Sequence, residues 1–188
     1  MKTREEVGAK ILEVASGFLG LYETKANAAW DDPDTLGADP AALLLPKLLK
    51  SVGWQPGWPY CAAFCEAVWR TAYAELGAPA ALQQRIATRL NPSVMESYRA
   101  WVTETTLTPI PGAIFFMQSG RGPFGHAGLV AKPGTRAFGT IEGNTAPAAT
   151  TAANDREGDG IFRRTRLLDF KKRETGLWLR GFLNPIAF

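Results

Sequence analysis

The chain has 188 residues, of which 46% are hydrophobic and 21% charged. This is an ordinary globular composition with enough length for a sizeable core, so we expect one domain spanning residues 1–188. The longest apolar runs fall far short of the ~18 to 20 residues that cross a membrane, and the first residues lack the apolar core of a signal peptide. The net charge of +3 is mild and does not indicate nucleic-acid binding.

The first half of the chain predicts helices. Thr3 and Glu6 form a capping box, and the helix that follows carries apolar residues at helical spacing: Val7, Ile11, Val14, Ala15 and Phe18. Residues 41–52 are rich in leucine and predict a short helix that Pro46 interrupts or kinks. A surface helix or connector is expected within 77–92, and a second capping box, Ser93 with Glu96, begins another helix.

Residues 21–39 are polar and rich in turn formers, which predicts a loop before the central helices. Asp32, Asp34 and Gly37 in this loop partly copy a calcium-binding loop. Leu36 occupies a ligand position, however, and no glutamate closes the far end, so we favour a solvated turn and assign no metal.

A Gly/Pro-rich loop runs into an apolar helical segment at residues 57–65, with Cys61 in its first turn. Cysteine reacts as a thiolate, and unpaired backbone N–H groups and the macrodipole stabilise that anion at a helix N-terminus. Apolar residues then recur at steps of three and four, ending near Gly77: Phe64, Cys65, Val68, Trp69, Ala72 and Leu76. The sequence therefore predicts a nucleophilic Cys61 at the open end of a buried helix.

The single histidine of the chain, His126, is the one imidazole available to Cys61 as a base. It opens an apolar run that predicts a strand after the Gly-rich loop of residues 119–125. A third group should orient the imidazole, and Glu142, near the end of the next predicted strand, is our candidate. Cys65 points along the buried face, and its spacing from Cys61 matches neither a disulfide nor a usual zinc site, so we expect reduced thiols.

After Pro109 the chain changes to short β-like runs separated by turns: 113–117, 126–132, 138–142, 160–166 and 178–183. Helices followed by a mostly antiparallel sheet predict an α+β fold. The order cysteine, histidine, acid along the chain fits a papain-like layout. The plain Ala/Thr stretch of residues 145–154 is expected to form a mobile loop beside the site.

Basic residues gather between 163 and 173: Arg163, Arg164, Arg166, Lys171, Lys172 and Arg173. Such a run can bind polyanions, including nucleic acid, by charge alone. Apolar and charged residues alternate within 161–166, and the acidic residues Asp169 and Glu174 interrupt the basic run. This pattern favours instead the solvent-exposed face of an edge strand and its turn. We therefore expect no nucleic-acid partner.

Four segments resemble, in order and spacing, the CHAP domains of the NlpC/P60-like cysteine peptidases: Pro59 to Phe64, Pro111-Gly112, Gly125 to Val130 and Ile141 to Asn144. The resemblance covers roughly residues 5–185. It implies a papain-like α+β fold in which N-terminal helices, with the nucleophile at a helix start, pack on a mostly antiparallel sheet. Tyr60 departs from the tryptophan usual in the family, and Ala113 from an acidic residue.

Carried over residue by residue, the resemblance implies that Cys61 is the nucleophile, His126 the base and Glu142 the orienting acid. Asn144 would be a further polar group of the site, either for the oxyanion or for holding substrate. Aromatic residues near the nucleophile in sequence are expected to stack on sugar or pack on a peptide stem: Trp54, Trp58 and Tyr60. Trp69, within the helix, is assigned to the core.

Members of this family are peptidoglycan amidases or endopeptidases. The resemblance thus implies a peptidoglycan hydrolase without a cofactor, either an N-acetylmuramoyl-L-alanine amidase or a stem or cross-bridge endopeptidase. Made in the cytoplasm without a signal peptide, it would reach the periplasm or cell wall as a phage-type lysin after holin release, or as an exported antibacterial effector. An immunity protein or a secretion carrier would then be a partner. Two alternatives stay open: a non-catalytic wall-binding CHAP-like module, and a cysteine peptidase or acyltransferase acting on another amide.

Overall fold

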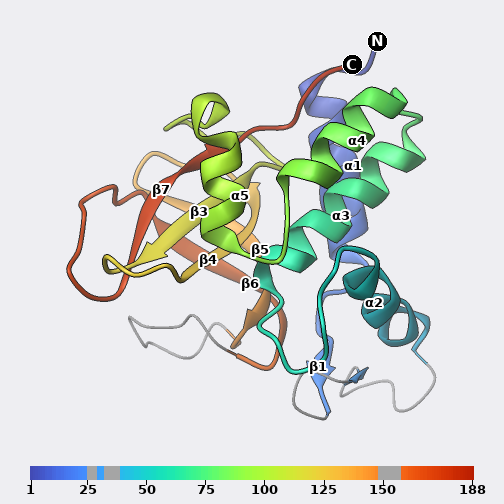
Figure 1. Cartoon of the computed structure of the whole chain (residues 1–188), viewed down its shortest axis with the longest axis horizontal. Coiled ribbons are helices and arrows are strands. Elements are labelled where there is room, and N and C mark those ends of the chain that lie inside the picture. The colour runs from blue at the N-terminus through green and yellow to red at the C-terminus, as the bar shows by residue number, and fades with distance from the viewer. Residues whose placement is uncertain (25–28, 32–38, 148–157) are drawn as a thin grey trace.

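The computed structural model of the chain describes residues 1–24, 29–31, 39–147 and 158–188, and these residues form an α+β fold. Helices occupy most of the first half, and an antiparallel sheet occupies most of the second (Figure 1). The predicted α+β class is therefore confirmed. The calcium-like segment at residues 32–38 and residues 148–154 of the predicted mobile loop lie outside the described residues.

The described helices follow the predicted pattern: α1 (Arg4–Ser16), α2 (Pro40–Ser51), α3 (Cys61–Glu75), α4 (Ala80–Arg89), α5 (Val94–Trp101) and the 3-10 helix η1 (Val102–Glu104). The capping box of α1 is formed, with the Glu6 N–H donating to Thr3 Oγ1 at 3.2 Å and the Thr3 N–H donating to Glu6 Oε2 at 2.8 Å. Pro46 lies inside α2 and does not end it. None of the helices in the described ranges has the length and apolar character needed to cross a bilayer.

The sheet has seven strands in the described residues: β1 (Tyr22–Glu23), β2 (Trp30–Asp31), β3 (Ile114–Ser119), β4 (Gly125–Lys132), β5 (Ala137–Thr145), β6 (Gly160–Leu167) and β7 (Leu177–Leu183). Their order is β2-β1-β6-β5-β4-β3-β7, and every pairing is antiparallel. The five longer strands fall on the five predicted runs. The prediction of a loop over 21–39 is wrong where the two short strands β1 and β2 lie, because Tyr22 of β1 pairs with Asp31 of β2 and with Gly160 of β6.

Strand β6 corrects the interpretation of the basic run. It lies between β1 and β5, so it is not the outermost strand of the sheet. Phe162 pairs with Glu142, and Arg166 pairs with Phe138. Because side chains alternate along a strand, Phe162 and Arg166 share one face of the sheet with Glu142. Arg163 is exposed as expected, whereas Arg166 points toward a buried carboxylate.

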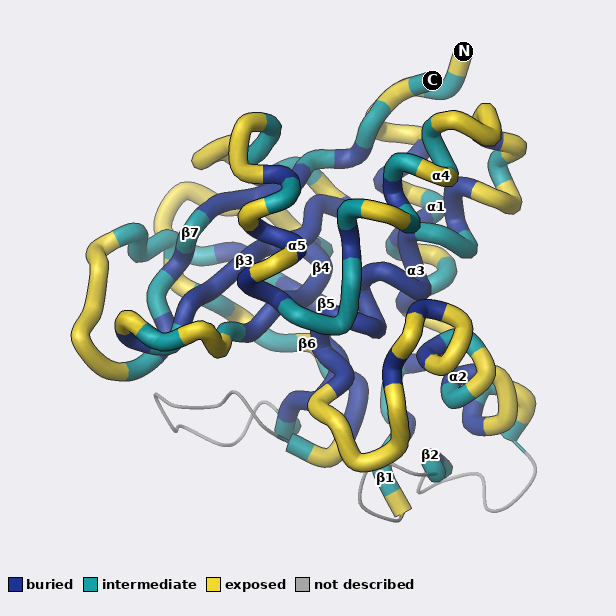
Figure 2. Tube along the Cα trace, viewed as in Figure 1, coloured by how far each residue is buried: buried dark blue, intermediate teal, exposed yellow. Residues whose placement is uncertain are grey.

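Two hydrophobic clusters fill the interior. The larger joins the helices to the sheet and contains most of α3, which is dark along much of its length in Figure 2. The smaller contains apolar side chains of the sheet, including Phe115, Val130, Phe138 and Phe182. Trp69 belongs to the core as predicted, and its indole N–H donates to the carbonyl of Gly112 at 3.1 Å. This packing fixes α3, and with it Cys61, against the sheet.

A glycine lets the start of α3 approach the sheet closely. A Cβ built at Gly143 on β5 would lie 3.0 Å from the Cβ of Phe64 and 3.1 Å from Cε2 of Tyr60. Contacts that short are tighter than nine in ten real Cβ contacts, so a side chain at Gly143 would require Phe64 and Tyr60 to shift by a few tenths of an ångström. The Ile141-Glu142-Gly143-Asn144 segment therefore sets the distance between the sheet and the first turn of α3.

Candidate functional site

Cys61 is the first residue of α3, directly after the N-cap residue Tyr60. No side chain in the described part of the chain caps this helix start, which leaves its first N–H groups for an anion. The thiol interacts with the backbone N–H groups of Ala62 and of Ala127 on β4. Cys61 is 5% exposed and lines a groove described below. The predicted placement of the cysteine at the start of a buried helix is confirmed.

His126 and Glu142 form a fully buried pair on neighbouring strands, β4 and β5. Nε2 of His126 lies 2.7 Å from Oε2 of Glu142. The other ring nitrogen, Nδ1, is buried and has no hydrogen-bond partner among the described residues. Because Nε2 is engaged by the carboxylate, Nδ1 is the atom that can exchange a proton with the Cys61 thiol, which interacts with the same ring.

The electrostatics of the three groups favour a charged thiol and a charged imidazole. Burial by itself would raise the pKa of the Cys61 thiol, but the adjacent His126 outweighs it and brings that pKa below its ordinary value. Burial would likewise lower the pKa of His126, but the thiol and the Glu142 carboxylate raise it to about 9. Each group thus stabilises the charged form of the other, and a thiolate beside an imidazolium is the reactive form of a cysteine nucleophile.

The Glu142 carboxylate is saturated with hydrogen bonds. Oε1 accepts from Thr140 Oγ1 at 2.6 Å and from Arg166 Nε at 2.8 Å, and Oε2 accepts from Arg166 Nη2 at 2.5 Å in addition to its contact with His126. Burial would raise the pKa of Glu142, but Arg166 and His126 hold it well below its usual range. Sequence reasoning missed Thr140 and Arg166. The alternation of side chains along β6 predicts that Arg164 and Arg166 lie on the same face of the strand. Only the pairing register of β6 with β5 shows that this face is the one that carries Glu142.

Asn144 ties the end of β5 to the nucleophile loop. Its Oδ1 accepts the backbone N–H of Tyr60 at 3.0 Å, and its side chain is buried. Its φ of 56° lies in the left-handed region, which asparagine tolerates better than most residues. Because the amide oxygen faces the backbone before Cys61, Asn144 is placed to position the nucleophile.

A groove of about 290 Å³ opens beside Cys61. The described residues that line it come from the loop before α3, the start of α3, the start of α5 and the β3–β4 loop, and none of them is Asp, Glu, Lys, Arg or His: Trp58, Pro59, Cys61, Pro92, Ser93, Val94, Pro123, Phe124 and Gly125. Trp58 is 47% exposed and Phe124 is 64% exposed, so both rings present accessible surface at the groove. Trp58 was predicted for this role, whereas Phe124 was not, because a loop aromatic gives no periodic signal.

The structure does not bring the other two predicted aromatic subsites into the groove. Trp54 is 2% exposed and Tyr60 is fully buried, and both rings pack against Trp30, at centroid distances of 5.5 and 5.3 Å. The expectation that they contact substrate is therefore wrong. Trp54 supports the groove indirectly, since its indole N–H donates to the carbonyl of Trp58 at 2.8 Å.

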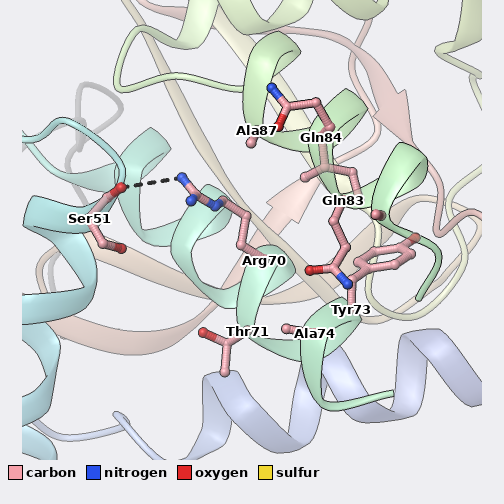
Figure 3. A pocket seen from close by; sticks show the side chains of 10 residues that line it. Ser51, Arg70, Thr71, Tyr73, Ala74, Gln83, Gln84 and Ala87 are labelled. Atoms are coloured by element: carbon pink, nitrogen blue, oxygen red, sulfur yellow. Dashed lines mark hydrogen bonds between the residues drawn. The ribbon is translucent and has the colours of Figure 1, made fainter. Parts of the chain in front are cut away.

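A second cavity, of about 500 Å³, lies between α3, α4 and the end of α2 (Figure 3). Arg70 donates to the carbonyl of Ser51 at 3.3 Å (Figure 3). It also donates to Oε1 of Glu66 at 3.3 Å. Arg70 lies nine residues after Cys61, about 13 Å along the helix axis. Its cation is engaged by protein groups, and the cavity contains no member of the Cys61 site.

Among the described residues, no cluster of three or more His, Cys, Asp or Glu side chains is arranged to hold a metal ion. Both cysteines are free and buried, and burial raises the pKa of Cys65 well above its ordinary value. The two thiols thus differ: Cys61 is activated by an imidazole, and Cys65 is a neutral core group.

The arrangement suits nucleophilic attack on a carbonyl group. It combines a thiolate, a proton donor, a carboxylate that fixes the donor, and free N–H groups at a helix start, all beside a groove. Comparison of the chain with protein-family models, with curated proteins and with solved structures finds no match in any of the three. The geometry of the site and the residues that compose it therefore carry the functional assignment.

Proposed function

We propose that the chain is a papain-like cysteine hydrolase that cuts an amide bond of peptidoglycan. The bond is either the one between muramic acid and L-alanine or one within the stem or cross-bridge peptide. The observation that carries the hydrolase assignment is the buried contact of His126 with Glu142 beside a thiol of lowered pKa at the start of α3. The substrate class is supported by the resemblance of the segments around Cys61, His126 and Glu142 to CHAP domains.

In the first step the Cys61 thiolate attacks the carbonyl carbon of the scissile amide. A C–S bond forms, and the carbonyl electron pair moves to the oxygen. The resulting oxyanion is stabilised by the unpaired backbone N–H groups at the start of α3. This stabilisation costs no reorganisation, because the helix is packed along most of its length and its first turn is fixed by Gly143 and Asn144.

In the second step the imidazolium of His126 gives its Nδ1 proton to the leaving nitrogen, the C–N bond breaks and an acyl thioester remains. The neutral imidazole then takes a proton from water, the hydroxide attacks the thioester, and the C–S bond breaks to release a carboxylic acid. The thiolate and imidazolium are restored together. Glu142 orients the ring throughout through its contact with Nε2.

The groove supports a substrate whose reacting end is uncharged. Its walls are apolar apart from Ser93 and the Cys61 thiol, and Trp58 and Phe124 present two exposed rings. Aromatic faces pack on the apolar face of a sugar or on alanyl methyl groups. Both groups flank the amide bonds of peptidoglycan, so the groove suits the amidase and the endopeptidase alike. We place the action of the enzyme at the cell wall, as a phage-type lysin or an exported antibacterial effector.

The test is mass spectrometry of soluble fragments released from purified peptidoglycan by the wild-type chain, by Cys61→Ala and by Cys65→Ala. Release by the wild type and by Cys65→Ala, with none by Cys61→Ala, is the expected result. The fragment masses and new termini separate amidase from endopeptidase. Absence of release by the wild type from several wall types would overturn the proposal and favour a binding module or another amide substrate.

A further inference from the structure

Arg166 of β6 makes an unusual contact for a residue that looks, in sequence, like part of a surface charge run. Its guanidinium donates two bonds to the buried Glu142, one to each carboxylate oxygen, at 2.8 and 2.5 Å. The Arg166 side chain is 12% exposed and the Glu142 side chain is fully buried. A two-point contact of this kind fixes the plane of a carboxylate as well as its position.

We propose that Arg166 is a positioning residue of the Cys61 site, which acts by fixing and charging the Glu142 carboxylate that orients His126. The proposal deepens the proposed function and rests on it only in taking Cys61 as the nucleophile. Arg166 and His126 both contact the Glu142 carboxylate, and His126 interacts with the Cys61 thiol, so the side chains form a series of contacts that leads to the thiol.

Thr140 completes the arrangement. Its hydroxyl donates to Oε1 of Glu142 at 2.6 Å, so each carboxylate oxygen has two neighbours. With both oxygens fully occupied, the carboxylate cannot rotate without breaking several bonds in a buried environment. The ring of His126 therefore meets an acceptor whose orientation is set by β6 and by Thr140.

The charge balance of the site gives Arg166 a second effect. In the described residues, the ionisable and charged groups around the His126–Glu142 pair are Cys61 and Cys65 on α3 and Arg166 on β6. Arg164, on the same face of β6 as Arg166, donates instead to the carbonyl oxygens of Ala146 and Pro147. Cys65 is neutral, because its pKa lies well above the ordinary value.

In the active form the site then contains two anions, Cys61 and Glu142, and two cations, His126 and Arg166. Removing the Arg166 charge takes a cation away from direct contact with Glu142, which favours uptake of a proton there. Glu142 then protonates at a higher pH, the imidazolium loses its counter-ion, and the thiolate is less stable. The rate of thiol modification falls at low pH because the thiolate becomes protonated, and we call this part of the rate–pH profile the low-pH limb. In the absence of the Arg166 charge this limb should move to higher pH.

The experiment measures the rate of Cys61 alkylation by iodoacetamide against pH, with peptide mass mapping to separate Cys61 from Cys65. Arg166→Gln is compared with wild type and with Arg163→Gln, which removes the same charge from an exposed position of the same strand. The expected result is an upward shift of the low-pH limb by about one pH unit or more in Arg166→Gln and no shift in Arg163→Gln. An unshifted limb in a folded Arg166→Gln protein would overturn the charging role.

Arg166→Lys separates charge from geometry and also serves if Arg166→Gln does not fold. Lysine retains the positive charge but cannot form the two parallel bonds. The limb should stay at the wild-type pH while the hydrolytic kcat falls, and a wild-type kcat would overturn the positioning role. A double-mutant cycle with Glu142→Gln adds a further check, because Arg166→Gln should have little additional effect on the limb in that background. Additive shifts would contradict action through Glu142.

The alkylation readout does not depend on the identity of the substrate. If the wild-type chain releases nothing from peptidoglycan but its low-pH limb still depends on Arg166, the proposed substrate fails and the role of Arg166 stands. If peptidoglycan is cut but the low-pH limb does not depend on Arg166, the proposed substrate stands and the role of Arg166 fails. The two proposals therefore fail in different experiments.

Discussion

The backbone N–H of Tyr60 donates to Oδ1 of Asn144 at 3.0 Å, which joins the residue before the nucleophile to the end of β5. Both partners are buried, and 84 residues separate them in the chain. The bond links the helix that carries Cys61 to the strand that carries Glu142. The mutual position of nucleophile and orienting acid thus depends on one side-chain amide.

Asn144→Ala should weaken both stability and activity. The substitution leaves a buried N–H of Tyr60 without an acceptor, which costs about 1–3 kcal/mol of unfolding free energy. Urea unfolding and kcat measure the two effects. Asn144→Asp is the matched control for geometry: it retains the acceptor and should retain more of the stability, while its negative charge raises the pKa of the nearby thiol. Wild-type unfolding and kcat in Asn144→Ala would contradict the positioning role.

The pH dependence should differ between hydrolysis and alkylation. Hydrolysis needs the thiolate together with a protonated imidazole, so kcat/KM should rise through the lowered pKa of Cys61 and fall again above the His126 pKa of about 9. Alkylation needs only the thiolate and should not fall above that pH. Parallel rate profiles against pH check this. A hydrolysis rate that keeps increasing above pH 9 would contradict an imidazolium donor.

His126 also predicts the sign of a stability change. Its pKa is raised in the folded protein from about 6.5 in the unfolded chain, so the protonated ring stabilises the fold fully below that unfolded value. This contribution is lost as the pH rises through about 9. Thermal unfolding of the wild type should show a decline over that range that His126→Gln lacks.

The sequence predicted the elements whose patterns are local. Helical spacing located α1 and α3, and turn signals bounded the five long strands, because these depend on residues close together in the chain. Cys61 and His126 were found as candidates from residue type and scarcity. Arg166 was misassigned, because its role depends on the register between β5 and β6, which the β6 sequence does not contain.

The aromatic residues illustrate the same limit. Trp54, Trp58 and Tyr60 are close in sequence, yet only Trp58 lines the groove. The direction of a ring in an irregular loop follows from packing against distant residues, here Trp30, and no periodicity predicts it. Phe124 reaches the groove from a loop that is far from Cys61 in the chain.

Trp58→Ala and Phe124→Ala should raise KM with little effect on stability, because both rings are exposed and line the groove. An aromatic contact of this kind corresponds to about a 2- to 10-fold change in KM. Leu43→Ala is the control, since this side chain is 62% exposed on α2 and does not line the groove. Equal KM values for all four proteins would show that the rings do not contact substrate.

Glu66 on α3 should limit stability above neutral pH. Its side chain is almost fully buried, its Oε2 has no hydrogen-bond partner among the described residues, and burial raises its pKa to about 7. A folded pKa above the unfolded one means that ionisation destabilises the fold as pH rises from about 4.5 through 7. Glu66→Gln should therefore stabilise the protein at pH 8 by up to about 3 kcal/mol and have little effect at pH 4.

Urea unfolding at the two pH values measures the effect of Glu66→Gln. Glu5→Gln is the control, because it removes the same charge from an exposed position of α1. A gain of equal size at both pH values would indicate a packing effect in place of the removal of a buried charge. The substitution retains an acceptor for Arg70, so the existing contact of 3.3 Å is not lost.

Gly128 on β4 should be intolerant of any side chain. A Cβ at this position would lie 2.7 Å from Cγ of Glu142 and 2.7 Å from Cε1 of Phe115, so the orienting acid or the core ring must move. Gly128→Ala should cost about 1–3 kcal/mol of unfolding free energy and lower kcat by displacing the carboxylate from His126. Gly139→Ala on β5 is the matched control, because its nearest neighbour, Cβ of Lys132, would lie at 3.5 Å, an ordinary contact. If the two alanine variants unfold at the same urea concentration and hydrolyse at the same rate, close packing at Gly128 does not position Glu142.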